Sequence, residues 1–134
     1  MHRNFAKADI LSRAVIGGAI EVHKALGPGL LEEIYKRCLI RELELRGLAI
    51  SSELVVPVVY KGMLVHGTLR LDVCVDGCLI IEAKAVQTLQ PIHQAQLLSY
   101  MRLLDAPVGI LINFNEIILK SGIRRLTLRG SSRP

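Results

Sequence analysis

LRLDVCVDGCLIIEAK, residues 69–84, is the stretch that decides the fold of this chain. Two apolar runs, residues 69–75 and 78–83, flank Asp76-Gly77, a dipeptide typical of a tight turn between antiparallel strands. Three charged side chains interrupt this apolar setting: Asp72, Glu82 and Lys84. An unpaired charge in an apolar site is destabilising by several kcal/mol, so these charges need an explanation. A divalent cation shared by the two carboxylates provides one.

The geometry of the turn decides whether the two carboxylates meet. Glu82 and Lys84 are two residues apart and therefore project from the same face of a strand. A two-residue loop would place Asp72 opposite Ile81, on the other face of the sheet. A three-residue loop, residues 76–78, pairs Asp72 with Glu82. We predict the three-residue loop, because it brings both carboxylates within reach of one metal ion.

The composition is typical of a globular protein. Hydrophobic residues make up 51% of the 134 positions and charged residues 22%. This length predicts a single domain over residues 1–134, with a core at about residues 9–128 and a loose tail at residues 129–134. The formal net charge of +5 favours a polyanionic partner.

The sequence carries no membrane or secretion signal. No apolar run approaches the roughly 20 residues of a membrane-spanning helix, and the N-terminus lacks the apolar segment of a secretory signal. The three cysteines (Cys38, Cys74 and Cys78) are an odd number without a C-x-x-C pair, which favours reduced thiols. We therefore expect a cytoplasmic protein without membrane contact.

Hydrophobic periodicity predicts three helices and a mixed sheet. Apolar residues at steps of three and four indicate helices over residues 9–26 and about 30–46, and Pro91 favours the start of a third, over residues 91–104. Apolar, valine-rich runs predict strands over residues 48–59, 63–75, 78–84 and 108–114, and a closing edge hairpin of residues 117–119 and 123–128. We expect an α/β (α+β) fold in the order α-α-β-β-β-α-β-β, with helices packed on the sheet.

Four separated motifs then point to a known family. They are GLLEEIY (29–35), RLDVCVDGCLIIEAKAV (70–86), HQAQLLSYMRLL (93–104) and LINF (111–114). Over residues 10–128 the chain resembles the GxxExxY proteins, a small branch of the PD-(D/E)XK nuclease superfamily. The resemblance implies a restriction-endonuclease-like αβββαβ core.

The resemblance also implies roles for individual residues. Asp72 corresponds to the acidic residue of the second core strand, and Glu82-Ala83-Lys84 to the E-x-K of the third. The proline of the superfamily name is replaced here by Leu71. Mg²⁺ or Mn²⁺ would be held by Asp72, Glu82 and the backbone carbonyl of Ala83. Glu32, on the second helix, is similar to an acidic residue that some members place near the metal.

The third predicted helix carries accessory candidates. Gln96 and Tyr100 are similar to a Q-x-x-x-Y motif of exonucleases in the superfamily. They lie one turn apart on the same side as His93, so the three could line a groove above the sheet. Arg70, Arg124 and Arg125 are candidates for phosphate contacts.

Each candidate also has a purely structural explanation. The charges of the hairpin could lie on a solvated strand edge. Glu32 could form an ordinary ion pair with Lys36, four residues later on the same helix. His93 could be structural, and the tyrosine could flank a polar helix face.

The residues together predict a metal-dependent nuclease that hydrolyses phosphodiester bonds of nucleic acid, with DNA as the favoured substrate. The alternative is a non-catalytic module that keeps the nuclease fold to bind nucleic acid or protein. A lysine beside two carboxylates favours the enzyme, because binding alone would not need it. Apolar helix surface also predicts a homodimer.

Overall fold

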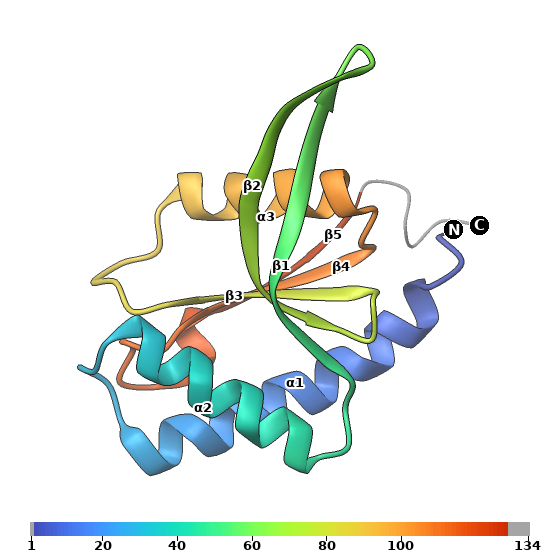
Figure 1. Cartoon of the computed structure of the whole chain (residues 1–134). Coiled ribbons are helices and arrows are strands. Elements are labelled where there is room, and N and C mark those ends of the chain that lie inside the picture. The colour runs from blue at the N-terminus through green and yellow to red at the C-terminus, as the bar shows by residue number, and fades with distance from the viewer. Residues whose placement is uncertain (1, 129–134) are drawn as a thin grey trace.

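A mixed β-sheet with helices on both faces makes up the described part of the chain, residues 2–128 of a computed structural model (Figure 1). The predicted loose tail, residues 129–134, lies outside that part. The helices are α1 (Phe5–Leu26), α2 (Glu32–Leu45) and α3 (Pro91–Leu104). The strands are β1 (Ile50–Tyr60), β2 (Met63–Val75), β3 (Leu79–Lys84), β4 (Val108–Asn113) and β5 (Ile123–Thr127).

Within residues 2–128 the five strands lie in the order β1-β2-β3-β4-β5. β3 and β4 are parallel and are joined through α3, whereas all other neighbouring strands are antiparallel. This connection is the one that a parallel pair requires, because its chain must return to the starting edge of the sheet. The predicted mixed sheet flanked by helices is confirmed.

Two hydrophobic cores lie on opposite faces of the sheet. α1 and α2 cover one face, where they pack on side chains such as Val73, Ile81 and Ile110. α3 covers the other face, where Leu97 and Met101 pack on residues such as Ile80. β4 is buried along its whole length, as its uninterrupted apolar sequence predicts.

The turn between β2 and β3 has the predicted three-residue loop. Val75 pairs with Leu79 and Val73 with Ile81, so the same register carried one residue further places Asp72 opposite Glu82. Positive φ angles at Asp76 (53°) and Gly77 (70°) allow the chain to reverse there. The two carboxylates therefore share one face of the sheet.

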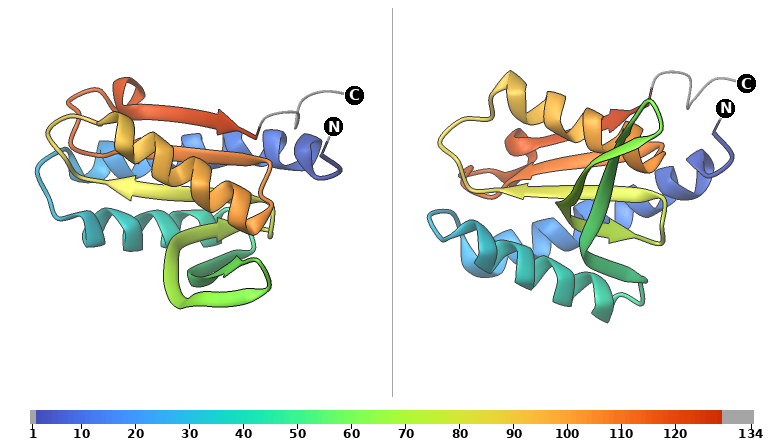
Figure 2. Two further views of the ribbon diagram at one scale, coloured as in Figure 1. Left: turned by 90° about the horizontal axis from the view of Figure 1, so that it is seen from above. Right: turned by 45° about the horizontal axis from the view of Figure 1, so that its top comes forward.

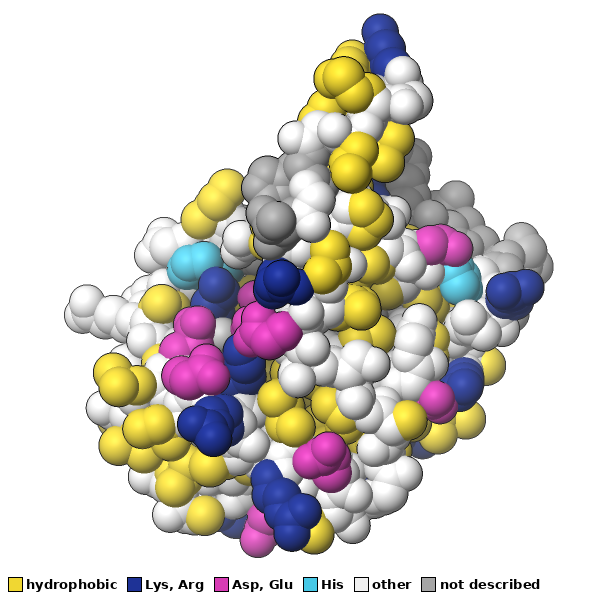
Figure 3. Space-filling view, viewed as in Figure 1, with side chains coloured by type: hydrophobic (Ala, Val, Ile, Leu, Met, Phe, Trp, Pro, Cys, Tyr) yellow, Lys and Arg dark blue, Asp and Glu magenta, His cyan; other side chains and the backbone are white. Residues whose placement is uncertain are grey.

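β1 and β2 extend beyond the helical layers as a two-stranded arm (Figure 2). The β1–β2 register shifts between Val56 and Val58, at Pro57, whose backbone has no N–H to donate to the neighbouring strand. The arm exposes large apolar side chains, which are visible along it in Figure 3. They are Val55, Val59, Tyr60, Met63, Leu64 and Val65.

Two boundaries differ from prediction. α1 begins at Phe5, one turn before the predicted position 9. The predicted strand at residues 117–119 is wrong, because Leu119–Gly122 forms a short 3₁₀-helix and Ile117 lies exposed outside any strand. Gly122, at the end of this 3₁₀-helix, packs so closely on β4 that a Cβ there would lie 2.7 Å from the Asn113 carbonyl oxygen. β5 then pairs with β4 by itself.

Within the described residues, no helix is long and apolar enough to cross a bilayer. Cys38, Cys74 and Cys78 are all free thiols.

Candidate active site

Asp72 and Glu82 lie side by side at the end of the α3-side core. Glu82 follows Ile80 by two residues on β3, so it points to the same face, yet it stands beyond the apolar contacts of α3. Only 6% of Glu82 is exposed to solvent, and the Asp72 side chain is 23% exposed. Two carboxylates are therefore held together away from bulk water.

The surroundings of these carboxylates oppose their ionisation. Burial and the neighbouring Asp72 raise the pKa of Glu82 to about 8, against a smaller opposing effect of Lys84. Burial also raises the pKa of Asp72, and Lys36, the Ala83 backbone amide and Lys84 offset this only in part. Carboxylates with raised pKa values that face each other are typical of functional sites.

Lys84 is close enough to both carboxylates to lower the pKa of each. None of the ion pairs found within residues 2–128 includes this lysine, so its ammonium is not tied to one carboxylate. Its backbone is fixed by a hydrogen bond from the Phe114 N–H to the Lys84 carbonyl, 2.8 Å long. The backbone of Lys84 is thus held in place, whereas its ammonium is not held in any ion pair found within residues 2–128.

Asn113 holds the chain that leaves β3. This side chain is fully buried, accepts a hydrogen bond from the Val86 N–H (3.0 Å) and donates one to the Val86 carbonyl (2.9 Å). The segment just after Lys84 is therefore anchored to β4. Sequence reasoning missed this residue, although a polar residue ending the apolar run VGILIN was a visible signal.

Lys36 is the second residue that sequence reasoning missed. Its ammonium lies 3.9 Å from Asp72 Oδ1 and 3.4 Å from Glu33 Oε2, and it donates a hydrogen bond to Glu53 Oε1. Only 7% of Lys36 is exposed, because it stands on the buried stripe of α2 with Leu39. That spacing was the available signal, since a residue three before a core leucine faces the core.

Charges of both signs gather where the arm meets the body, beside α2 (Figure 3). Burial would lower the pKa of Lys36, but Glu53, Asp72 and Glu33 outweigh it and hold that pKa above its ordinary value. The hydrogen bond from Lys36 lowers the pKa of Glu53 in turn. The Lys36 side chain therefore keeps its positive charge at this site.

Glu32 stands at the first position of α2, which the preceding loop fixes. The Tyr35 hydroxyl donates a hydrogen bond to the Gly27 carbonyl (2.5 Å) and accepts one from the Leu30 N–H (3.0 Å). The Tyr35 ring stacks on Phe114, with centroids 4.8 Å apart. In the GLLEEIY motif, Tyr35 therefore lies in the core, whereas Glu32 lies near the carboxylate pair.

The position of Glu32 argues against a simple surface pair with Lys36. Lys36 pairs instead with Glu33, Glu53 and Asp72. Glu32 is close enough to Glu82 for its charge to raise the pKa of that carboxyl.

Tyr100 and Gln96 face the carboxylates from α3, whereas His93 has a structural contact. Burial and the nearby Glu82 raise the pKa of Tyr100, and a hydrogen bond from Gln96 (3.3 Å) partly offsets this. His93 Nδ1 accepts a hydrogen bond from the Gln90 N–H (2.9 Å) and completes a capping box at the start of α3.

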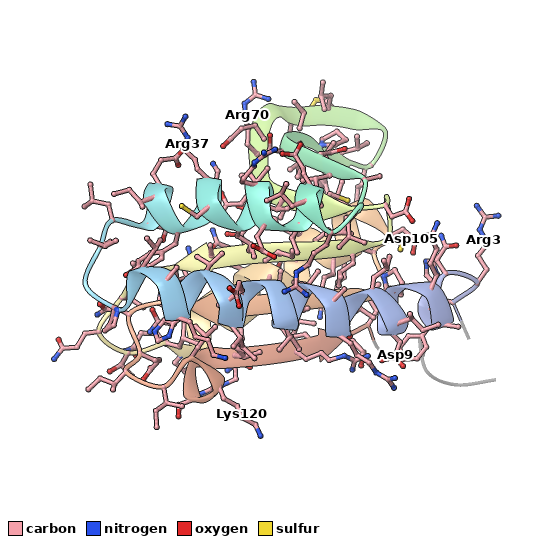
Figure 4. All side chains as sticks on the ribbon, turned by 90° about the horizontal axis from the view of Figure 1, so that it is seen from below. Arg3, Asp9, Arg37, Arg70, Asp105 and Lys120 are labelled. Atoms are coloured by element: carbon pink, nitrogen blue, oxygen red, sulfur yellow. The ribbon has the colours of Figure 1, made fainter. Side chains whose placement is uncertain are left out.

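Arg70 lies apart from the other two arginine candidates, Arg124 and Arg125, which are neighbours on β5. Arg70 lies near the site, where it donates a hydrogen bond to the Glu53 carbonyl (3.5 Å). Arg125 pairs with Asp9 of α1, and Arg124 bonds to the Ser121 carbonyl (2.9 Å). Figure 4 shows Arg70 on the side of the arm and α2, and Asp9 on the opposite side. Of the three, Arg70 is therefore the one next to the carboxylates.

The donor set at the centre of the site consists of hard oxygen atoms. Within residues 2–128, no group of three or more His, Cys, Asp or Glu side chains is arranged to hold a metal ion. Mg²⁺ needs fewer, because it keeps several waters and is bound by one or two carboxylates. Asp72 and Glu82 match that need, because they present carboxylate oxygens side by side at one shielded position of the sheet.

Comparison with known proteins agrees with this geometry. A family model described as the PD-(D/E)XK nuclease superfamily matches residues 9–126. No curated protein and no solved structure matches the chain. The mixed sheet flanked by helices is consistent with a restriction-endonuclease-like fold. Because the match reaches from α1 into β5 and covers most of the chain, the chain belongs to the PD-(D/E)XK nuclease superfamily.

Proposed function

We propose that this chain is a metal-dependent nuclease of the GxxExxY branch that hydrolyses phosphodiester bonds of DNA. The observation that carries the proposal is the buried pair of Asp72 and Glu82 with Lys84 beside it. A domain kept only to bind nucleic acid gains nothing from burying two carboxylates together, because the pair is costly to ionise in this setting. A bound divalent cation would compensate both negative charges.

Asp72, Glu82 and the backbone carbonyl of Ala83 would hold Mg²⁺ or Mn²⁺. When bound, the ion polarises the phosphodiester and lowers the pKa of a coordinated water. The Lys84 ammonium offsets the negative charge that develops on the phosphate and orients the attacking water. Glu32 adds a carboxylate from α2 near Glu82.

Substrate contacts would come from the arm side of the molecule. Arg70 lies next to the site and supplies a cation for a phosphate of the backbone. Gln96 and Tyr100 line the opposite wall from α3. The net charge of +5 supports association with a polyanion.

We also propose that the chain forms a homodimer through the arm. Large apolar side chains that remain exposed on a projecting hairpin favour contact with a second protein surface. The sequence predicted exposed apolar surface on the helices, and the structure has it at Ile10, Ile20, Ile34, Leu45, Ile92 and Leu103. The arm adds six further exposed apolar residues along one hairpin: Val55, Val59, Tyr60, Met63, Leu64 and Val65. Sedimentation velocity over a range of concentrations tests this, and Val59→Lys should shift the protein toward monomer. A monomer at every concentration would contradict it.

Cleavage assays test the nuclease itself. Purified protein is incubated with Mg²⁺ or Mn²⁺ and a panel of single-stranded, duplex and branched DNA and RNA. We expect cleavage that chelation abolishes and that Lys84→Ala lowers by about 10²- to 10³-fold. Cleavage that survives in Lys84→Ala would contradict the proposed site, and DNA binding without cleavage of any substrate would favour the non-catalytic module.

A further inference from the structure

We propose that Lys36 is a built-in counter-cation of Asp72, which lies beside this carboxylate before metal binds and which the metal must displace. This inference rests on the proposed metal site. It concerns a lysine outside the E-x-K motif, on a helix rather than on the core strands. The consequence is that Lys36 sets the affinity of the site for its metal.

Asp72 is approached by an ammonium from the α2 side. Lys36 Nζ lies 3.9 Å from Asp72 Oδ1, and the lysine is 7% exposed. A divalent ion bound by the same oxygen would meet this ammonium at close range, and like charges in a site shielded from water repel strongly. The two cations therefore compete for Asp72.

Glu53 already holds the Lys36 ammonium by a direct hydrogen bond, so the lysine stays paired if it moves away from Asp72. In the β1–β2 register, Glu53 stands opposite Asp72, between the pairs Ser52–Val73 and Leu54–Leu71. Its φ angle is +53°, a left-handed conformation that residues with side chains rarely adopt, and its carboxylate accepts a hydrogen bond from Lys36. The strained backbone thus serves to hold the lysine.

Space for the displaced ammonium lies on the far side from Asp72. An open cavity of about 290 Å³ is lined by residues of α2 and β1, among them Glu33, Lys36 and Glu53. Glu33 and Glu53 have side chains 64% and 52% exposed, so an ammonium that moves toward them stays paired and gains water. Lys36 can therefore leave Asp72 without becoming an unpaired buried charge.

Mn²⁺ titration by calorimetry tests the competition. Lys36→Met should bind Mn²⁺ about tenfold more tightly than wild type, because the competing charge is gone. Glu53→Gln should bind more weakly, because Lys36 then depends more on Asp72. In the K36M background, E53Q should change the affinity little, which separates an effect through Lys36 from the general loss of a negative charge.

Arg37→Met is the matched control. Arg37 is the neighbouring cation on α2, and its side chain points outward at the rim of the molecule (Figure 4). Its removal should alter Mn²⁺ affinity less than twofold. Equal effects of K36M and R37M, an unchanged or weaker affinity in K36M, or an E53Q effect that persists in the K36M background would each overturn the inference.

A second measurement needs no metal. Thermal unfolding in the presence of a chelator is compared for wild type, K36M, D72N and the double variant. K36M should lower the unfolding temperature more in the wild-type background than in the D72N background, because the pairing exists only with Asp72 ionised. Equal decreases would overturn the pairing. Absence of Mn²⁺ binding in all variants, with the unfolding difference present, would contradict the metal site instead of the Lys36–Asp72 pair.

Discussion

The two faces of strand β3 carry side chains of different character. Toward α1 and α2, Leu79, Ile81 and Ala83 are fully buried in an apolar core. Toward α3, Ile80 is buried in the same way, but Glu82 and then Lys84 follow it along the strand. The first face stabilises the fold, and the second uses that rigidity to hold charges together.

The comparison shows where a site can form in a small domain. α3 covers Ile80 with Leu97 and Met101, and its apolar contacts end near Tyr100. Beyond that point the sheet is still shielded from water, yet the side chains are polar. The candidate functional residues lie at the edge of the region that α3 covers. At such an edge, burial shifts the pKa values of side chains, and a substrate still has access.

The largest effect on stability is expected from a charge placed on the apolar face of β3. Ile81→Glu places a carboxylate one residue from Glu82 but in the apolar core, where no cation lies. We expect the variant to lose more than about 4 kcal/mol of unfolding free energy, or not to fold. Urea unfolding followed by circular dichroism measures this, with Ile81→Val as the conservative control at a loss of about 1 kcal/mol. A folded, stable Ile81→Glu would contradict the distinction between the faces.

Neutralising Glu82 should stabilise the metal-free protein, with a dependence on pH. The folded pKa is about 8 and the ordinary value is 4.5, so between these values the folded state holds a proton that the unfolded state has lost. The unfolding free energy of wild type therefore falls as pH rises through this window. Glu82→Gln does not titrate and should exceed wild type by about 2 kcal/mol at pH 8.5, with the gap closing toward pH 5.

Denaturant unfolding across this pH range, with a chelator present, checks that prediction. Ser99→Ala, an exposed change on α3, controls for a general effect of substitution. A constant difference between Glu82→Gln and wild type at all pH values would show that Glu82 titrates normally.

A substitution in the core on the α1–α2 side of the sheet should also affect the site, because α2 carries Glu32. Tyr35→Phe keeps the stack on Phe114 but removes the hydroxyl that bridges Gly27 and Leu30. We expect a loss of about 1–2 kcal/mol in unfolding free energy and faster amide exchange at Leu30, two residues before Glu32 at the start of α2. Unchanged exchange at Leu30 would mean that the loop is held by other contacts.

The smallest effects should separate the two sides of the molecule. Arg125→Ala removes a solvent-exposed ion pair with Asp9 and should alter stability by about 0.5 kcal/mol, with no change in DNA affinity. Arg70→Ala should weaken DNA binding and reduce the salt dependence of log Kd by about 1. Fluorescence anisotropy at several salt concentrations checks both, and a larger effect of Arg125→Ala would place the DNA on the other side.

Local sequence patterns predicted the fold well because most elements have strong local signals. Pro91 begins α3 as expected, and the apolar run at residues 108–114 became the buried β4. The three-residue loop was predictable because only that register gives the carboxylates a common face. The strand predicted over residues 117–119 is wrong because only one end of this apolar segment is buried: Leu119 packs into the core from a 3₁₀-helix, whereas Ile117 is exposed.

The site was predictable only in part, for a physical reason. Asp72, Glu82 and Lys84 lie on one hairpin, so their spacing indicates their common face. Lys36 and Glu53 reach the site from α2 and β1, and their approach depends on helix packing and on a left-handed backbone angle that the sequence does not reveal. Arg124 and Arg125, which the sequence offered as phosphate contacts, do not reach the carboxylates. Their position follows from the pairing of β5 with β4 at the far edge of the sheet, which is again a matter of packing.

Proton release on metal binding tests the central claim most directly. If Asp72 and Glu82 hold the metal, binding at pH 7 must displace the proton that Glu82 retains with its pKa of about 8. Calorimetric titration of Mn²⁺ in buffers of different ionisation enthalpy should therefore show release of close to one proton per ion, and Glu82→Gln should abolish the release. Binding with no proton release, or with the same release in Glu82→Gln, would contradict a metal site at this carboxylate pair.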